Sequence, residues 1–298
     1  MIYRGRFAPT PSGDLHLGSL VAALASYLDA RAADGQWLVR IEDVDTQRSR
    51  KHFESAILFE LERHGLHWDG EVVRQSQRTR YYDDALQRLY THGLAYRCHC
   101  SRSKLSKSGC PRNPEGEFIY PAICRPEFLQ ASPEILNFRD LQTSYRFRVD
   151  SLPTVFVDEW LGTQSICVFK EAGDFLLRRS DGNYAYNLAV VVDDFDQGIN
   201  NVVRGMDILP LTARQVLLQK ALGYSTPRYK HCPLVLSPDG AKLSKSSSAR
   251  ALKESAANQN LTHALKFLGI EIRALDGGSC GEILDYSIDV WRKKQRFS

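Results

Sequence analysis

The chain alternates short apolar strands with longer amphipathic segments over its first ninety or so residues, and this alternation limits the fold more than any other feature. A strand is expected over residues 2–7, ending in a stiff loop rich in proline and glycine. A helix is expected over residues 16–33 and a buried strand over 37–41. Such alternation favours a parallel sheet with right-handed crossovers. Two further helices are predicted by the spacing of Phe53, Ile57, Leu58 and Leu61, and of Tyr82, Leu86 and Leu89.

The alternation breaks after Tyr96, where cysteines, prolines and glycines replace periodic apolar residues. We interpret this region as an insertion that continues into small antiparallel strands. Apolar runs then restore the buried core, and a helix is expected over residues 211–222. The predicted organisation is the first half of the parallel-sheet domain at 1–96, the insertion at 97–183, the second half of that domain at 184–236 and a short helical C-terminal region at 237–298. The expected antiparallel strands are 145–149, 154–157 and 175–178; the apolar runs are 188–192 and 201–204.

Composition limits the classes of protein to consider. The 298 residues are 43% hydrophobic and 25% charged, as in an ordinary globular protein. The net charge of +4 is compatible with a polyanionic partner but too small to indicate one. No apolar run approaches the roughly 18–20 residues that span a membrane, and no secretory leader is seen. We therefore expect a cytoplasmic protein whose seven cysteines are reduced. We also expect a monomer.

Residues 6–19, Arg-Phe-Ala-Pro-Thr-Pro-Ser-Gly-Asp-Leu-His-Leu-Gly-Ser, predict a strand, a turn and a helix N-terminus. Unpaired N–H groups and the positive end of a helix dipole suit a phosphate there. His16 can donate to phosphoryl oxygens, and Gly18 lets a nucleotide approach the backbone. The alternative is a structural turn in which Asp14 or Ser12 simply caps the helix.

A second loop, Lys242-Leu-Ser-Lys-Ser246, carries two lysines among serines. Lysines that engage an α-phosphate and a departing pyrophosphate only in the transition state would lower the barrier to adenylate formation. The alternative is a solvated basic loop.

Together the two segments resemble the paired HIGH and KMSKS motifs of class I aminoacyl-tRNA synthetases. Residues 6–16, 38–45, 184–194 and 202–207 are similar to the matching segments of glutamyl-tRNA synthetases. The resemblance implies an α/β, Rossmann-type parallel sheet that binds Mg²⁺–ATP and L-glutamate. It implies catalytic roles for His16, Lys242 and Lys245; ATP contacts from Pro9, Gly13, His16, Gly18, Ser19 and Lys245; and glutamate contacts from Arg6, Ala8, Thr10, Glu42, Tyr186 and Arg204.

These glutamate contacts agree with the chemistry of the side chains. An arginine fork suits a carboxylate, and a glutamate can pair with an ammonium group. The family often has serine where this chain has Thr10. The structural alternatives are an ion pair of Glu42 or Asp43 with Arg40 or Arg48, and an ion pair of Arg204 with Asp193 or Asp194.

Cys98, Cys100 and Cys124 offer three soft ligands, and a tetrahedral Zn²⁺ needs a fourth. The spacing leaves His99 and Cys110 open as that ligand, and buried cysteines without metal are the alternative. The resemblance to short relatives of the glutamyl enzymes points to Tyr120 instead. Cys167, Cys232 and Cys280 are expected to be ordinary thiols.

After the lysine loop, only residues 247–298 remain, too few for the usual anticodon-binding part. This length resembles that of short relatives that activate glutamate without tRNA and transfer it to queuosine in the anticodon loop of tRNA(Asp). The alternatives are a truncated glutamyl-tRNA synthetase that charges a tRNA 3′ end, and a catalytically silent tRNA-binding paralogue.

Overall fold

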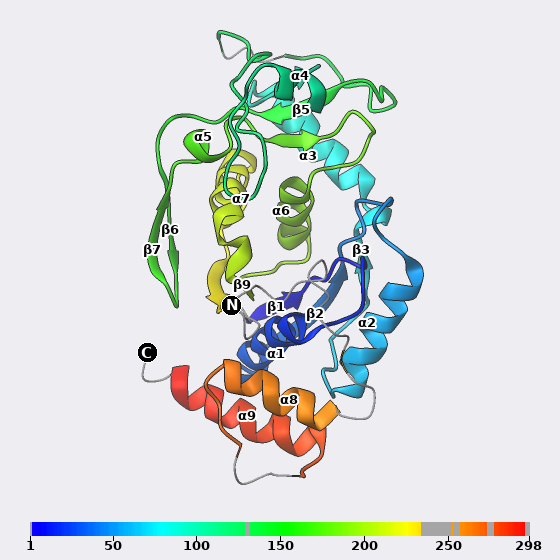
Figure 1. Ribbon diagram of the computed structural model, residues 1–298, viewed down its shortest axis with the longest axis vertical. Helices are drawn as coiled ribbons and strands as arrows, with labels where there is room; N and C mark the ends of the chain where they lie inside the picture. The colour runs from blue at the N-terminus through cyan, green and yellow to red at the C-terminus, as the bar shows by residue number, and fades with distance from the viewer. Residues whose placement is uncertain (1, 129–131, 234–251, 253–256, 273–276, 296–298) are drawn as a thin grey trace.

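The predicted N-terminal parallel strands are present in the computed structural model, which describes residues 2–128, 132–233, 252, 257–272 and 277–295. Strands β1 (Arg4–Phe7), β2 (Gln36–Ile41) and β3 (Val73–Arg74) form one parallel sheet in that order. Helices α1 (Leu17–Ala32) and α2 (Lys51–Arg63) connect them (Figure 1). The expected boundaries agree with these to within a few residues. No helix in the described ranges is long and apolar enough to cross a membrane.

A second sheet continues this layer with β9 (Asn201–Gly205), β10 (Arg228–Cys232), β6 (Thr154–Asp158) and β7 (Gly162–Ile166). The β10 strand is parallel to both β9 and β6, whereas β7 is antiparallel to β6. The backbone N–H of Asn200 donates to the carbonyl of Arg4, so β9 lies beside β1. One strand expected in the antiparallel insertion, β6, therefore also belongs to the parallel layer.

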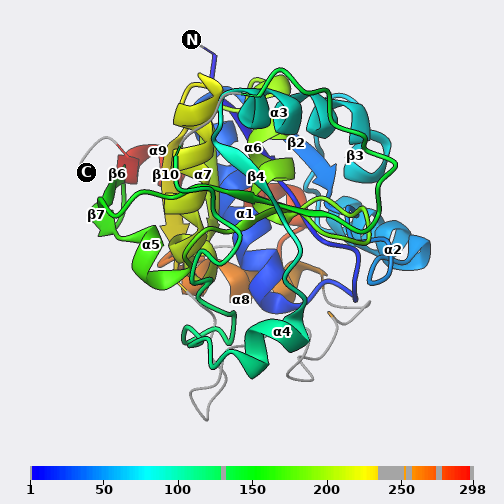
Figure 2. The ribbon, with the colours of Figure 1, turned by 90° about the horizontal axis from the view of Figure 1, so that it is seen from above.

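The insertion has its own sheet, in which β5 (Ser144–Phe147) lies antiparallel between β4 (Ala95–Cys98) and β8 (Leu176–Arg178). Figures 1 and 2 show this sheet above α6 (Tyr186–Asp196) and α7 (Leu209–Leu222). It forms one end of the molecule. The insertion also contains α4 (Arg102–Lys107) and α5 (Val168–Glu171), and α3 (Thr79–Thr91) leads into it. Two 3₁₀ turns, at Gln75–Gln77 and Met206–Ile208, lie outside the insertion.

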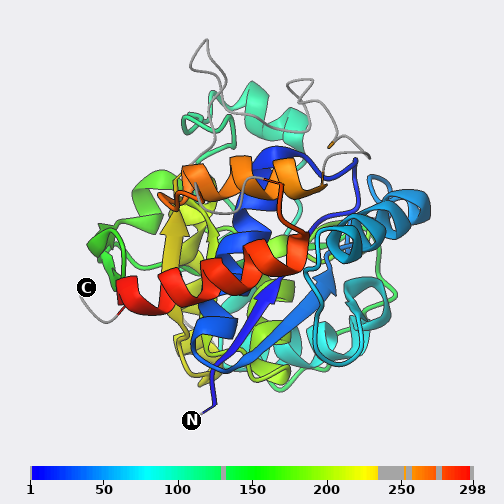
Figure 3. The same ribbon diagram turned by 90° about the horizontal axis from the view of Figure 1, so that it is seen from below.

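The short helical C-terminal region consists of α8 (Ala257–Phe267) and α9 (Cys280–Gln295). Figure 3 shows both helices lying across α1, on the side opposite the insertion. The buried carboxylate of Asp29, on α1, accepts hydrogen bonds from Trp291 of α9 (3.0 Å), Lys230 of β10 (2.8 Å) and Tyr3 (2.6 Å). This carboxylate connects the C-terminal helices to the sheet.

The described apolar side chains form two large clusters and one small one. The first surrounds β1, β2 and α1 and includes Trp291. The second lies between α3, α6, α7 and the insertion. The third contains Tyr96, Cys98, Leu105 and Tyr120. Of the metal ligands predicted from the sequence, Cys98 and Tyr120 belong to the third cluster, and Cys100 and Cys124 pack against it.

Candidate active site

A pocket of about 340 Å³ opens at the carboxyl ends of β1 and β9, beside the N-terminus of α1. Adjacent parallel strands whose crossovers leave in opposite directions create a crevice at this edge of a sheet, where ligands of such folds bind. Nine of the predicted residues line it: Arg6, Ala8, Pro9, Thr10, His16, Gly18, Ser19, Tyr186 and Arg204.

Four predicted residues do not line this pocket or cannot be placed in it. Glu42 lies behind the wall, and its backbone N–H donates to the carbonyl of Pro9 at 3.0 Å. Gly13 belongs to the same loop but is absent from the lining. Lys242 and Lys245 lie outside the described residues.

His16 is the N-cap of α1. Its Nδ1 accepts a hydrogen bond from the backbone N–H of Ser19 at 3.2 Å, and its Nε2 lies 3.0 Å from the Ser19 hydroxyl. The structural alternative, in which Asp14 or Ser12 caps the helix, is therefore wrong, because the histidine ring occupies the capping position. This end of the helix faces the pocket with its backbone N–H groups, which favours an anionic ligand.

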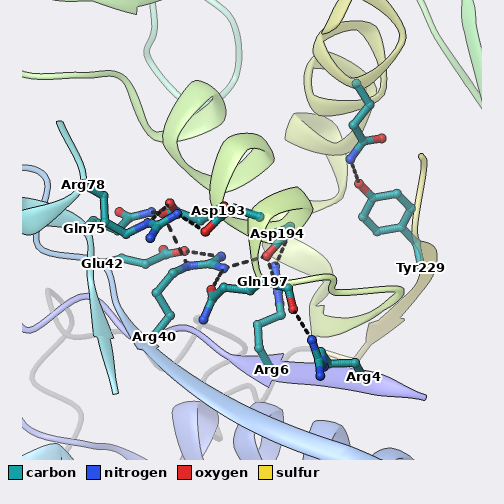
Figure 4. Close-up of polar contacts among 12 residues, drawn as sticks. Arg4, Arg6, Arg40, Glu42, Gln75, Arg78, Asp193, Asp194, Gln197 and Tyr229 are labelled. Atoms are coloured by element: carbon teal, nitrogen blue, oxygen red, sulfur yellow. Dashed lines mark hydrogen bonds and ion pairs between the residues drawn. The ribbon is translucent and has the colours of Figure 1, made fainter. Parts of the chain in front are cut away.

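Arg6 reaches the pocket from β1 and is held by a carboxylate on α6. Its Nε and Nη2 donate to the two oxygens of Asp194 at 3.0 and 3.2 Å, and Arg40 donates to the same carboxylate at 2.8 Å (Figure 4). Burial opposes ionisation of Asp194, but the charges of Arg6 and Arg40 outweigh it and hold the pKa of Asp194 below its usual range. Arg6 is thus fixed in position and its charge is balanced.

Asp193, the neighbouring carboxylate, faces a different set of partners. It accepts hydrogen bonds from Arg78 (2.6 Å), Gln75 (2.8 Å) and the Tyr82 hydroxyl (2.8 Å). Neither aspartate of this pair forms a described ion pair with Arg204, so the structural alternative for that arginine is wrong.

Oε1 of Glu42 lies 3.4 Å from Nη2 of Arg40, near the end of β2, which is the ion pair of the structural alternative. Burial raises the pKa of Glu42 to about 7, although the charges of Arg40 and Arg6 oppose this rise. Asp43 instead accepts hydrogen bonds from Ser76. Arg48 lies 3.7 Å from Asp45 rather than from Glu42. A buried carboxylate that titrates near neutrality is typical of a functional site.

Tyr186 and Arg204 complete the far wall. Tyr186 begins α6, and burial raises its pKa to about 12, so the phenol stays protonated and can donate a hydrogen bond. Arg204 lies on β9 and is 5% exposed. Its Nε donates to His231 at 3.0 Å and its Nη2 to the Thr212 hydroxyl at 2.7 Å. The buried Nη1 of Arg204 has no hydrogen-bond partner among the described residues.

The sequence did not reveal the roles of several of these residues. Asp194 as the partner of Arg6, and His231 and Thr212 as partners of Arg204, lie far from those arginines in the chain, so local spacing could not reveal them. Cys232, expected to be an ordinary thiol, lines the pocket. Only its position at the carboxyl end of a buried strand could have suggested this.

The cysteines of the insertion come together away from the pocket. The Sγ atoms of Cys98, Cys100 and Cys124 lie within 4.8 Å of one another, and the Tyr120 hydroxyl is 3.4 Å from Cys98. Among the described residues, this group includes neither His99 nor Cys110. Three thiols and a phenol fit the donor set of a tetrahedral Zn²⁺ site.

Arg146 supports this cluster from β5. Its Nε donates to the Cys98 sulfur at 3.2 Å, and its guanidinium lies 3.7 Å from the centre of the Tyr120 ring. Burial and a hydrogen bond with Cys124 raise the pKa of Cys100 to about 11. A bound divalent cation would favour the thiolate forms that this environment otherwise resists, and Arg146 would offset part of their negative charge.

The chain was compared with known protein families and curated proteins. A family model described as tRNA synthetases class I (E and Q), catalytic domain, matches residues 3–273. The Glutamyl-Q tRNA(Asp) synthetase of Pseudomonas syringae pv. tomato is 47% identical over 290 residues, which cover 97% of this chain and 92% of the relative. The protein of the same name from Dechloromonas aromatica is 45% identical over 293 residues, covering 97% and 94%.

Solved structures show the same fold. A glutamate tRNA ligase from Elizabethkingia meningosepticum, in complex with its amino acid, has a TM-score of 0.68 and 30% identity, over 83% of this chain and 52% of that one. The glutamate-tRNA synthetase of Elizabethkingia anophelis has a TM-score of 0.69 and 30% identity, over 83% and 53%. This chain therefore matches only about half the length of these two proteins.

Proposed function

The chain belongs to the glutamyl-Q tRNA(Asp) synthetases, ligases of the class I tRNA synthetase family, and we propose that it transfers ATP-activated glutamate to queuosine in the anticodon loop of tRNA(Asp). The observation that carries the proposal is a single pocket that combines two arginines with the N-terminus of α1. Arginines suit the carboxylates of glutamate, and a helix N-terminus suits phosphate.

In this proposal Arg6 and Arg204 bind the substrate carboxylates, and Ala8 and Thr10 contact the amino acid from the β1–α1 loop. Tyr186 donates its phenolic hydrogen bond, which its raised pKa preserves. Glu42 pairs with the substrate ammonium. The effect of its charge on Tyr186, which lines the pocket, supports this role.

ATP is assigned to the α1 side of the pocket, against Pro9, Gly13, His16, Gly18 and Ser19. The α-carboxylate of glutamate attacks the α-phosphorus of Mg²⁺–ATP, and pyrophosphate leaves with the electrons of the broken P–O bond. His16, Lys242 and Lys245 stabilise the phosphate charge, and positioning supplies much of the rate. A ring hydroxyl of queuosine then attacks the glutamyl carbonyl, loses its proton and displaces AMP, leaving an ester.

The proposal also covers the domain boundaries, the zinc ligands, the oligomeric state and the location in the cell. We place the catalytic domain at 1–96 and 184–236, the insertion at 97–183 and the lysine loop with the helical region at 237–298. Cys98, Cys100, Tyr120 and Cys124 would hold one Zn²⁺, which would stabilise the fold of the insertion. A monomer acting in the cytoplasm, where tRNA is found, fits this function.

Activation is tested by glutamate-dependent ATP–pyrophosphate exchange in the absence of tRNA. We expect exchange with L-glutamate and a much lower rate with L-glutamine and L-aspartate. A silent tRNA-binding protein would give no exchange with any of them. Exchange that requires tRNA would favour a charging enzyme, whose family generally needs tRNA for activation.

The acceptor is tested with an isolated anticodon stem-loop of tRNA(Asp) that carries queuosine and has no CCA end. Labelled glutamate should become attached to it through an alkali-labile ester. The matched control is the same stem-loop with guanosine in place of queuosine, which should stay unlabelled. Charging of a full tRNA that lacks queuosine, with no transfer to the stem-loop, would refute the proposal.

A further inference from the structure

A chain of buried hydrogen bonds runs from the β6–β7 turn to the wall of the pocket. The Asp158 carboxylate lies 2.6 Å from Nδ1 of His231, and Nε2 of His231 accepts a hydrogen bond from Nε of Arg204 at 3.0 Å. The Thr212 hydroxyl accepts from Nη2 of the same arginine. The side chains of Asp158 and His231 are fully buried. Water therefore does not replace these partners.

The bonds fix where the histidine proton lies. An arginine Nε–H can only donate, so Nε2 of His231 must be the unprotonated ring nitrogen. The proton is then on Nδ1, where Asp158 accepts it. Burial lowers the pKa of His231, and the charge of Arg204 lowers it further, against the opposing effect of Asp158. The neutral ring facing Arg204 is thus the stable form.

Asp158 has little freedom to bind differently. Its second oxygen accepts the backbone N–H groups of Trp160 and Leu161 at 3.0 and 2.9 Å. These groups can only donate, so that oxygen is committed to the turn. The turn therefore orients the carboxylate toward His231.

The two arginines of the pocket differ in how their charges are balanced. Arg6 donates twice to a carboxylate, Asp194. Arg204 donates to an imidazole and a hydroxyl, both neutral, and forms no ion pair with a described carboxylate. Its Nη1 is buried without a hydrogen-bond partner among the described residues. Leaving such a charged group unpaired is costly, and a carboxylate ligand would remove this cost.

We propose that His231 and Asp158 are positioning residues that present Arg204, with its charge uncompensated, to a carboxylate of the amino-acid substrate. A carboxylate in place of His231 would hold Arg204 as firmly but would neutralise it. The neutral histidine holds the guanidinium and leaves its charge to the ligand. The inference deepens the proposed function and rests on it.

The test compares three substitutions by glutamate-dependent exchange. In His231→Asn, the amide can still donate to Asp158 but is too short to accept from Arg204. In His231→Gln, the amide oxygen can reach the position of Nε2. In Asp158→Asn, the carbonyl must face the turn, so the amide donates to Nδ1 of His231, moves the ring proton to Nε2 and sets it against Arg204.

We expect the KM for glutamate to rise roughly 10- to 100-fold in His231→Asn and Asp158→Asn, as for the loss of a hydrogen bond to a charged group. The KM for ATP should change by less than about threefold, and His231→Gln should recover most of the glutamate KM. Equal losses in His231→Asn and His231→Gln, or parallel changes in both KM values, would overturn the inference in favour of simple packing.

His64→Asn is the matched control. His64 is also fully buried, but it caps the C-terminus of α2, and its Nδ1 hydrogen-bonds the backbone carbonyl of Glu60. The variant should unfold more easily without changing the KM for glutamate. Should His64→Asn raise that KM as much as His231→Asn does, the effect would be one of general stability, and the inference would fail.

The tautomer provides a readout that does not depend on activity. In protein labelled with ¹⁵N-histidine, the signals of His231, assigned by their loss in His231→Gln, should show a protonated Nδ1 and an unprotonated Nε2. Asp158→Asn should reverse them. A protonated Nε2 in the unsubstituted protein would overturn the inference even if the enzyme activates glutamate. Conversely, the expected tautomer in a protein that neither binds nor activates glutamate would refute the proposed function alone.

Discussion

At the scale of single residues, burial controls the protonation of the pocket. Glu42 and Tyr186 both have raised pKa values because burial removes the water that would stabilise their charged forms. Asp194 has a lowered pKa, because two arginines outweigh the same effect. The carboxyl groups of Glu42 and Asp194, which have similar intrinsic acidity, are thus shifted in opposite directions within one site.

Glu42 should make glutamate binding depend on pH. An ammonium group binds the carboxylate, not the acid, so the KM for glutamate should rise as the pH falls through about 7. Glu42→Gln should show a high KM at every pH and no such dependence. Initial rates of exchange between pH 6 and 8.5 would measure both.

The stability of the same variant separates binding from folding. A carboxyl whose pKa is raised on folding favours the folded state at low pH, and this contribution is lost as the pH rises through about 7. Glu42→Gln should therefore not lower the free energy of unfolding at pH 8. A large loss of stability at that pH would contradict the position we give to its charge.

Asp194 should be essential to the fold as well as to Arg6. Asp194→Asn would leave the buried Arg6 without a carboxylate partner and remove one from Arg40, at a cost of about 3–5 kcal/mol in the free energy of unfolding. Because the pKa of Asp194 is lowered on folding, its contribution should be present at neutral pH and fade only in acid. Urea unfolding at pH 7 measures the loss.

The control for this variant is Glu134→Gln, which removes an exposed ion pair with Arg97. Its urea midpoint should remain that of the unsubstituted protein, because solvent screens such pairs. Equal midpoints for Asp194→Asn and Glu134→Gln would show that the buried aspartate does not stabilise the fold.

At the scale of elements, α1 is packed between the sheet and the C-terminal helices. Its N-terminus lines the pocket, and its Asp29 binds the sheet and α9 together. Trp291 is buried in this contact and stacks edge-on against Trp160 of the β6–β7 turn, with ring centres 5.7 Å apart. The C-terminal helices thus support the strands and helix that form the pocket.

Trp291→Ala should cost about 3–5 kcal/mol in the free energy of unfolding, as for other buried tryptophans. Trp291→Phe keeps most of the packing and loses only the bond from Nε1 to Asp29, so it should cost less. Tyr286→Ala, at a more exposed position of α9, is the control. Thermal or urea unfolding measures the free energy of unfolding of the three variants. If Trp291→Ala lowered it no more than Trp291→Phe or Tyr286→Ala does, the result would contradict this account of how α9 is attached.

At the scale of the whole molecule, the cysteine cluster belongs to a core of its own. Its apolar residues form a cluster separate from those around the pocket. The pocket residues are held by β1, β9, α1 and α6, none of which contributes a cysteine ligand. The insertion and the parallel layer can therefore respond differently to metal.

Purified protein should contain about one Zn²⁺ per chain, and Cys100→Ser should lower this content, as elemental analysis would show. Amide hydrogen exchange in Cys100→Ser should speed up around residues 98–124, while the amides of β1, β2 and α1 keep their protection. Uniform loss of protection in all these elements would show that the cluster supports the whole fold. Unchanged zinc content would remove Cys100 from the ligand set.

The local elements and most of the pocket wall could be predicted from the sequence. The strand–loop–helix spanning residues 6–19 was confirmed because its signals are local: proline, glycine and apolar period. The joining of Arg6, His16, Tyr186 and Arg204 in one pocket was expected from resemblance and agrees with the structure. Their roles remain predictions.

The partners of the charged side chains were decided by the tertiary structure alone. Arg6 and Asp194 are separated by 188 residues, and the sequence suggested Asp193 or Asp194 for Arg204 instead. Residues 187–194 of α6 are all buried, so no amphipathic pattern reveals which side of the helix faces β1 and which faces β9. The packing of α6 places Asp194 against Arg6, and Arg204 hydrogen-bonds His231 instead. A buried charged group needs a hydrogen-bond partner, and which partner is close enough depends on how the elements pack.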